Sequence, residues 1–274
     1  MCGRFVGFRR LEELRNHFPI DVADVESTEN FNVAPTQEIL AIVRHDDQNH
    51  LEKLNWGLVP FWAKDTTIGS RMINARSETV ATKPSFRNAF RKRRCLILAD
   101  GFYEWAGEPG HKKPMFITLP NGEPFAFAGL WEIWDNKGKE KTPYRSATIL
   151  TREASESMVA IHHRMPVILK PAAFNAWLNP NNQNPESLQE IIQDQIYTEL
   201  KAVPVSKAVN SVNNNRPSID DVASIFVHSC LNAIEQSDQA SSGCRSNGAA
   251  DTNTKPSSMG FTDTLIFRKE LTDW

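Results

Sequence analysis

The sequence predicts an α+β fold whose core is a mainly antiparallel, barrel-like β-sheet with flanking helices and a disordered C-terminal tail. Six segments between residues 51 and 170 are rich in β-branched and aromatic residues and are separated by Gly, Pro and Asn, as strands are. Apolar residues recur at helical spacing only near the start of the chain and after residue 170. From about residue 233 the chain is polar and rich in small residues, so it cannot bury enough apolar surface to become ordered.

An amphipathic helix is the first expected element. It covers residues 8–18, where Leu11, Leu14 and Phe18 recur at helical spacing among charged residues. Strand-like composition then dominates the segments 51–62, 94–105, 114–120, 123–134, 144–151 and 165–170. These segments predict a largely antiparallel sheet.

Asn121-Gly122 separates two of these strands and predicts a hairpin. A type I′ turn needs positive φ at both central residues, which Asn and Gly tolerate best. Two helices are expected next, over residues 171–178 and 185–200. The second begins with Pro185 and has an acidic first turn.

The chain divides by composition into one domain and an appendage. Residues 2–232 are expected to form the domain, since a single core supports up to about 250 residues. Residues 233–260 are a low-complexity linker. Residues 261–274 regain apolar side chains and are either a short docking segment or a frayed end.

Composition narrows the function classes. The net charge of −2 gives no case for nucleic-acid binding by the whole chain, so any such surface must be a local patch. The four cysteines are widely spaced and form no Cys/His ligand cluster, so we expect neither a metal site nor a disulfide scaffold. We also expect no cofactor. No signal peptide or membrane-spanning run is present, and we expect a soluble protein in a reducing compartment inside the cell.

Cys2 is the feature that carries the most chemistry. Removal of Met1 would present an α-amine and a thiol on adjacent carbons, a pair of nucleophiles that no internal cysteine offers. An aldehyde is the natural target, because the amine can form a Schiff base and the thiol can close it to a five-membered thiazolidine. The amine has a pKa of about 7.7–8.0 and the thiol one near 8.5, so both are partly reactive at neutral pH.

Four short segments place polar residues where strands end or turns begin: Cys2-Gly3-Arg4, residues 73–76, residues 100–105 and residues 161–166. Together with residues 56–60 and 205–210, in this order after a second-position cysteine, they resemble the SRAP (SOS response-associated peptidase) family of abasic-site processing proteins. The resemblance covers roughly residues 2–230.

The resemblance implies a sensor of abasic sites in single-stranded DNA that shields the lesion during DNA repair. Cys2 would trap the ring-opened sugar aldehyde as a thiazolidine cross-link after removal of Met1. Glu104 and His162 match the family's positions for acid–base catalysis, where a carboxylate and an imidazole can exchange roles near neutrality. Asn74 corresponds to the asparagine that holds the lesion, whereas His163 has no matching role. Lyase activity and autoproteolytic loss of Met1 also belong to this expectation.

Candidate DNA contacts lie outside this set. Arg4 and Arg76 are expected to bind phosphate, with structural ion pairs as their alternative. Trp62 matches the position of the family's aromatic residue that wedges against DNA bases. Its neighbours are Phe61 and Ala63, whereas some members of the family have paired tryptophans here. A basic run with interleaved aromatics is expected to track the DNA backbone or to be a solvated face; it comprises Arg87, Arg91, Lys92, Arg93, Arg94, Phe86 and Phe90.

The sequence leaves three other functions open. An N-terminal-nucleophile hydrolase, either a glutamine amidotransferase or a cysteine peptidase, would use the same Cys2. A non-catalytic single-stranded DNA binder would leave Cys2, Glu104 and His162 unexplained. We expect a monomer with no membrane partner, cytoplasmic or nucleoid-bound in a bacterium and nuclear in a eukaryote, with a replication-associated partner at the tail. Cys95 is expected to be a buried strand cysteine.

Overall fold

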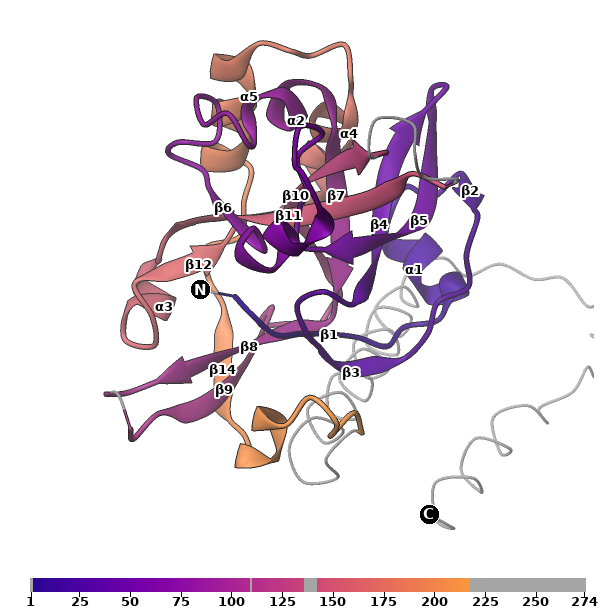
Figure 1. The fold of residues 1–274 in the computed structure, drawn as a ribbon. Coiled ribbons are helices and arrows are strands. Elements are labelled where there is room, and N and C mark those ends of the chain that lie inside the picture. The colour runs from indigo at the N-terminus through magenta and orange to yellow at the C-terminus, as the bar shows by residue number, and fades with distance from the viewer. Residues whose placement is uncertain (1, 109, 136–141, 217–274) are drawn as a thin grey trace, which may run out of the picture. The chain divides into compact units, whose positions relative to one another are not determined.

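A closed ring of five strands forms the centre of the fold (Figure 1). The computed structural model describes residues 2–108, 110–135 and 142–216, all within one compact unit, Met1–Leu231. The ring runs in the order β5 (Gln48–Trp56), β4 (Glu38–His45), β7 (Arg94–Ala99), β10 (Phe125–Trp134) and β11 (Tyr144–Glu153). These neighbours are antiparallel, and a parallel pairing of β11 with β5 closes the ring. The predicted α+β class with a barrel-like, mainly antiparallel core is confirmed.

Short strands extend this sheet, and a second sheet lies beside it. The additions are β2 (Val22–Ala23) on β5, β6 (Asn74–Arg76) and β12 (Arg164–Pro166) on β11, and β13 (Ile168–Leu169) on β10. The second sheet has the order β14 (Lys201–Pro204), β9 (Lys113–Thr118), β8 (Gly101–Ala106), β1 (Phe5–Gly7) and β3 (Asn30–Val33).

The helices are α1 (Leu11–His17), α2 (Arg87–Lys92), α3 (Glu156–Val159), α4 (Phe174–Leu178) and α5 (Pro185–Asp194), with 3-10 turns η1 (Thr66–Arg71), η3 (Pro171–Ala173) and η4 (Lys207–Asn210). Of these, α2 and α4 contact the ring strands β7 or β10, whereas η4 lies against β9 of the second sheet. Figure 1 shows α2, α4 and α5 grouped over one side of the barrel. Side chains alternate along β7, so Leu96 and Leu98 pack outward among these helices, while Cys95 and Ile97 fill the interior. The expected burial of Cys95 is confirmed.

The predicted strand over residues 94–105 is two strands that belong to different sheets. The break is at Asp100, which is 2% exposed. Its carboxylate accepts hydrogen bonds from the Phe8 amide (2.9 Å) and from Arg9 Nε (2.8 Å). A buried carboxylate needs these partners, so the chain bends here to reach the first strand.

The hairpin predicted at Asn121-Gly122 is wrong. β9 pairs with β8 and β14, and β10 pairs with β7, β11 and β13, so the turn connects two sheets. Only Gly122 has positive φ (72°), and its amide donates to the Leu119 carbonyl (3.0 Å) across a turn with Pro120 and Asn121 at its centre. The type I′ conformation occurs instead between β4 and β5, at two aspartates with φ of 47° and 64°, Asp46 and Asp47.

Other boundaries differ for local reasons. The helix expected over residues 8–18 is confirmed in part as α1, and the one expected over 185–200 ends at Asp194 because Ile196 forms a bridge with Leu169 instead. The strand expected over 51–62 ends at Trp56, since Gly57 has a φ of 130° that ends the pleat. Strands β1, β3, β6 and β14 have three or four residues each, too few for a recognisable alternation.

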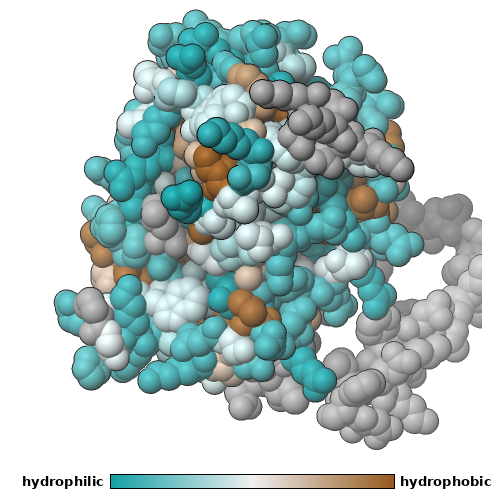
Figure 2. Space-filling view, in the orientation of Figure 1, coloured by the Kyte–Doolittle hydropathy of each residue, from teal (hydrophilic) through white to brown (hydrophobic). Residues whose placement is uncertain are grey.

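The surface is mostly hydrophilic. Figure 2 shows that apolar side chains on this face form small, separate patches. The large apolar side chains that are most exposed are Phe61, Trp62, Ile133, Val159 and Val212. In the parts of the chain that the structure describes, no helix is both long and apolar enough to cross a bilayer. The expected tail segments, 233–260 and 261–274, lie outside the described residues.

Gly129→Ala is expected to destabilise the barrel. A Cβ at this position of β10 would lie 2.7 Å from Cys95 Sγ and 2.8 Å from Ile97 Cδ1, both inside the closed ring. Overpacking of this kind costs about 1–3 kcal/mol, which urea denaturation would measure as a lower free energy of unfolding. Gly7→Ala is the control, because its nearest contact would be at 3.9 Å. Equal stability of both variants would contradict the packing described.

Candidate functional site

Cys2 is held at the buried start of the first strand. Phe5 pairs with Phe102 of β8, and this antiparallel register places Glu104 opposite Gly3, one residue from Cys2. The Asn74 amide nitrogen donates to the Cys2 carbonyl (2.8 Å) from the other side. Cys2 itself is fully buried. The strand pairing therefore brings the second residue of the chain between the two sheets.

The surroundings of Cys2 keep its thiol protonated. Burial raises the pKa of the Cys2 thiol far above its usual range, and the negative charge of Glu104 raises it further. Glu104 is only 6% exposed, so water screens this interaction weakly. In the chain as described, Cys2 is a neutral thiol beside a carboxylate.

His162 lies in the same electrostatic environment. Burial lowers the pKa of the His162 imidazole, and the Glu104 carboxylate opposes this shift. The Arg164 amide donates to His162 Nδ1 (2.9 Å), which leaves the proton of the neutral ring on Nε2. The Arg164 carbonyl lies 3.1 Å from the same nitrogen and can accept a hydrogen bond from the charged form. His162 can therefore be hydrogen-bonded in either protonation state.

Arg164 fixes the turn that carries His162. Its guanidinium forms a bidentate ion pair with Glu78 (2.7 and 2.9 Å) and donates to the Thr151 carbonyl (2.7 Å). His163, by contrast, is exposed and stacks on the His162 ring at 4.3 Å. Arg164 is recognisable in the sequence only as part of a motif. Glu78 could not be found there, because it lies 86 positions away and has no local signal.

Three predicted catalytic residues thus meet from separate parts of the chain. Cys2 precedes β1, Glu104 lies on β8 and His162 follows α3. The Glu104 charge acts on both of the others, which joins the three groups electrostatically. The arrangement supplies a nucleophile, a carboxylate and an imidazole that can exchange protons.

Asn74 faces this group from β6. Its amide nitrogen is used by Cys2, whereas its Oδ1 is buried and has no hydrogen-bond partner among the residues that the structure describes. A buried acceptor without a partner costs free energy, which a donor on a bound molecule would recover. Asn74 is therefore suited to hold a substrate hydroxyl or amine beside Cys2.

The predicted phosphate ligands differ in their surroundings. Arg4 donates from Nη1 to Asn32 Oδ1 (2.6 Å) and to the Val209 carbonyl (2.9 Å), and its guanidinium lies 6.0 Å from the Trp105 ring. Partial burial lowers the Arg4 pKa. Arg76 is exposed at the end of β6. Arg4 therefore holds the 205–210 segment through the Val209 carbonyl, while Arg76 faces solvent.

Trp62 is exposed on the surface. It is 48% exposed, and the neighbouring Phe61 is 53% exposed, in the turn that follows Gly57. The Trp134 indole donates to the Ala63 carbonyl (2.9 Å) and holds this turn against β10. Two adjacent aromatic side chains are therefore available for stacking.

The expected basic strip with interleaved aromatics is wrong in part. Phe86 and Phe90 are buried, because the helical period of α2 places them on the face toward the core. Arg93 pairs with Glu132 at 2.7 Å. Arg94 is buried and caps the end of α2 through backbone carbonyls. The exposed basic residues of the run are Arg87, Arg91 and Lys92.

Glu104→Gln is expected to lower the pKa of both Cys2 and His162. A negative charge disfavours the thiolate and favours the imidazolium, so its removal shifts both titrations toward lower pH. NMR of the His162 ring and the pH dependence of Cys2 alkylation, followed by peptide mass spectrometry, measure the two shifts. Glu108→Gln, at an exposed position after β8, should change neither. A raised Cys2 pKa in Glu104→Gln would contradict the arrangement.

Arg94→Ala is expected to lower stability by about 2–4 kcal/mol, because it leaves buried carbonyl groups without a donor. Arg94 donates to the Trp177 carbonyl (2.7 Å) and the Phe90 carbonyl (2.9 Å), and burial lowers its pKa to about 10. Arg91→Ala, at an exposed position of α2, should change stability by less than about 0.5 kcal/mol. Denaturant midpoints of the two variants measure the difference. Similar losses of stability in both variants would contradict a buried, hydrogen-bonded Arg94.

Comparison with known proteins gives a consistent result. The sequence matches the family described as SOS response associated peptidase (SRAP) over residues 1–212. Abasic site processing protein YoqW of Bacillus subtilis (strain 168) is 45% identical over 222 residues, which cover 80% of this chain and 98% of that protein. Abasic site processing protein YedK of Escherichia coli (strain K12) is 30% identical over 220 residues, covering 78% and 96%.

Solved structures share the fold. A protein from Bacteroides thetaiotaomicron superposes with a TM-score of 0.69 at 24% identity, covering 80% of this chain and 99% of that one. A protein from Bordetella bronchiseptica has a TM-score of 0.62 at 26% identity, covering 75% and 100%. On the family match and the identity to these relatives, the chain belongs to the SOS response associated peptidase family.

Proposed function

We propose that this protein senses abasic sites in single-stranded DNA and links itself covalently to them through Cys2 after Met1 is removed. The observation that carries the proposal is the meeting of Cys2, Asn74, Glu104 and His162, of which Cys2 and Glu104 are buried and the other two are partly exposed. The relatives named for abasic site processing support the same substrate. The cross-link would shield the lesion from strand cleavage.

The reaction begins with the sugar aldehyde and the Cys2 α-amine. The amine adds to the carbonyl carbon to give a carbinolamine, which loses water to form an imine. The thiol then adds its sulfur to the imine carbon while its proton moves to the nitrogen, and the ring closes as a thiazolidine. One water leaves and no oxidant is needed.

Each of these steps includes a proton transfer, and two side chains would serve it. Opening the closed sugar and dehydrating the carbinolamine both need an acid and a base near the reacting atoms. The lowered pKa of His162 keeps it mostly neutral near pH 7, with a proton on Nε2 to give. Glu104 would accept and return protons at Cys2, whose thiol must lose its proton to close the ring.

Asn74 and the exposed cations would position the DNA. The free Oδ1 of Asn74 would accept a hydrogen bond from the opened sugar. Arg76 would bind a phosphate next to the lesion, while Arg4 would hold the 205–210 segment against the site. Trp62 with Phe61 would stack on neighbouring bases.

Two finer activities belong to the same proposal. Glu104 lies next to the start of the chain and would assist autoproteolytic removal of Met1. The Schiff base formed on Cys2 would also permit strand cleavage by β-elimination when ring closure is slow. Both activities use the groups that form the cross-link.

An abasic oligonucleotide tests the proposal. The protein should give a shifted band under denaturing conditions, and Cys2→Ala should give none, since it lacks the thiol that closes the ring. Glu104→Gln should lower the rate at which the band forms by about 10²-fold or more. Cys230→Ala, which keeps Cys2, is the matched control.

Mass spectrometry of the intact protein must show that the chains that form the cross-link lack Met1. No band from protein that lacks Met1, or an equal band from Cys2→Ala, would overturn the proposal. Glutaminase activity without a band would instead favour an N-terminal-nucleophile hydrolase.

A further inference from the structure

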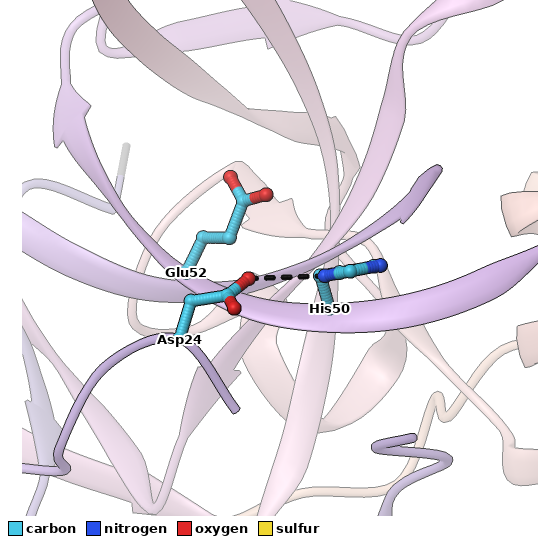
Figure 3. Close-up of side chains that lie close together, drawn as sticks. All are labelled: Asp24, His50 and Glu52. Carbon is cyan, nitrogen blue, oxygen red and sulfur yellow. Dashed lines mark hydrogen bonds and ion pairs between the residues drawn. The ribbon is translucent and has the colours of Figure 1, made fainter. Parts of the chain in front are cut away.

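A second cluster of titratable side chains lies on the ring sheet, outside the Cys2 site. His50 and Glu52 alternate with Leu54 along β5 and therefore face the barrel interior with it. Asp24 follows β2, which pairs with β5 at this level in the register Val22↔His50. Figure 3 shows the Asp24 carboxylate pointing at His50, with Glu52 extending from the same strand as His50.

The donor atoms of this cluster are close enough to share one ion. One nitrogen of His50 and one carboxylate oxygen each of Asp24 and Glu52 all lie within 4.8 Å of one another. Ligands of a tetrahedral zinc ion, bound at 2.0–2.2 Å, are about 3.4 Å apart. A contraction of at most roughly 1.4 Å would therefore bring the three donors to this spacing, and the Asp24 side chain is half-exposed at the surface.

His45 lies beside the cluster but outside the group of three donors that lie within 4.8 Å of one another. Its Nε2 lies 2.9 Å from Glu52 Oε1, and its ring meets the His50 ring at 5.4 Å. The same nitrogen lies 3.3 Å from Arg145 Nη2. His45 Nε2 cannot donate a hydrogen bond to the Glu52 carboxylate and accept one from the Arg145 guanidinium at the same time. One of these two contacts is therefore unsatisfied in either protonation state of His45.

Arg145 is the competitor for this site. Its guanidinium forms an ion pair with Glu52 and lies 4.7 Å over the Trp131 ring. A cation near Glu52 would be repelled by Arg145, and the two carboxylates must outweigh that charge. The competition predicts moderate rather than tight binding.

We infer that Asp24, His50 and Glu52 form a binding site for a divalent first-row transition-metal ion such as Zn²⁺, with water as the fourth ligand. One imidazole and two carboxylates are a donor set that such ions accept. On binding, the His50 imidazole keeps one proton, which moves to the ring nitrogen that faces away from the ion. The ion would connect Asp24, just after β2, to the β4–β5 hairpin and so stabilise the edge of the ring sheet. The expectation of no metal site rests on cysteine spacing, whereas these candidate ligands are one histidine and two carboxylates.

Zinc binding to the full chain tests the inference. The Cys2→Ala variant is used throughout, so that the thiol is absent and cannot chelate the ion together with the terminal amine. Isothermal titration should show one Zn²⁺ per chain, and Zn²⁺ should raise the melting temperature. His50→Ala should weaken binding at least tenfold, and His111→Ala, an exposed histidine outside the cluster, should not change it.

Two further measurements identify the ligands. Co²⁺ in place of Zn²⁺ should give visible bands of a tetrahedral site without a thiolate charge-transfer band, since no ligand is a cysteine. Arg145→Met should tighten binding, because it removes the competing charge from Glu52. Equal binding by His50→Ala, a thiolate band, or no binding at all would each overturn the inference. The cross-linking reaction of the Cys2-containing protein should be unchanged by His50→Ala.

Discussion

The candidate site depends on how the first strand is held. Cys2 lies so close to the start of the chain that its position is set almost entirely by the strand that it precedes. Phe5 supplies that support, because it pairs with Val33 and Phe102 and packs its ring at 5.1 Å from Trp56 and 5.7 Å from Phe127. Burying such a side chain contributes about 1.5–3 kcal/mol toward holding this three-residue strand between the sheets.

Strand β11 carries the opposite wall of the site. It pairs with β5 to close the ring, with β6 through Ile149↔Asn74 and with β12 through Glu153↔Arg164. Asn74 and the turn that orients His162 are therefore attached to the same backbone. The hydrogen bond from Asn74 to the Cys2 carbonyl (2.8 Å) connects this wall to the start of the first strand.

Burial and one carboxylate decide the protonation states at the site. Burial holds both the Cys2 thiol and the His162 imidazole toward their neutral forms. The charge of Glu104 raises the pKa of both groups. It makes the thiol harder to ionise and the imidazole easier to protonate. Such an arrangement favours passing a proton between groups over storing a permanent ion pair, as acid–base catalysis of a condensation requires.

The sequence by itself determined the α+β class and most of the longer strands, because alternation and helical period are local patterns. Short motifs that resemble a known family were enough to predict Cys2, Asn74, Glu104 and His162 as site residues. Pairing was decided only by the tertiary structure. Asn121-Gly122 joins two sheets while Asp46 and Asp47 make the hairpin, and Glu78 reaches Arg164 from 86 positions away. Burial, hydrogen-bond partners and local charge come from segments far apart along the chain, so no local pattern encodes them.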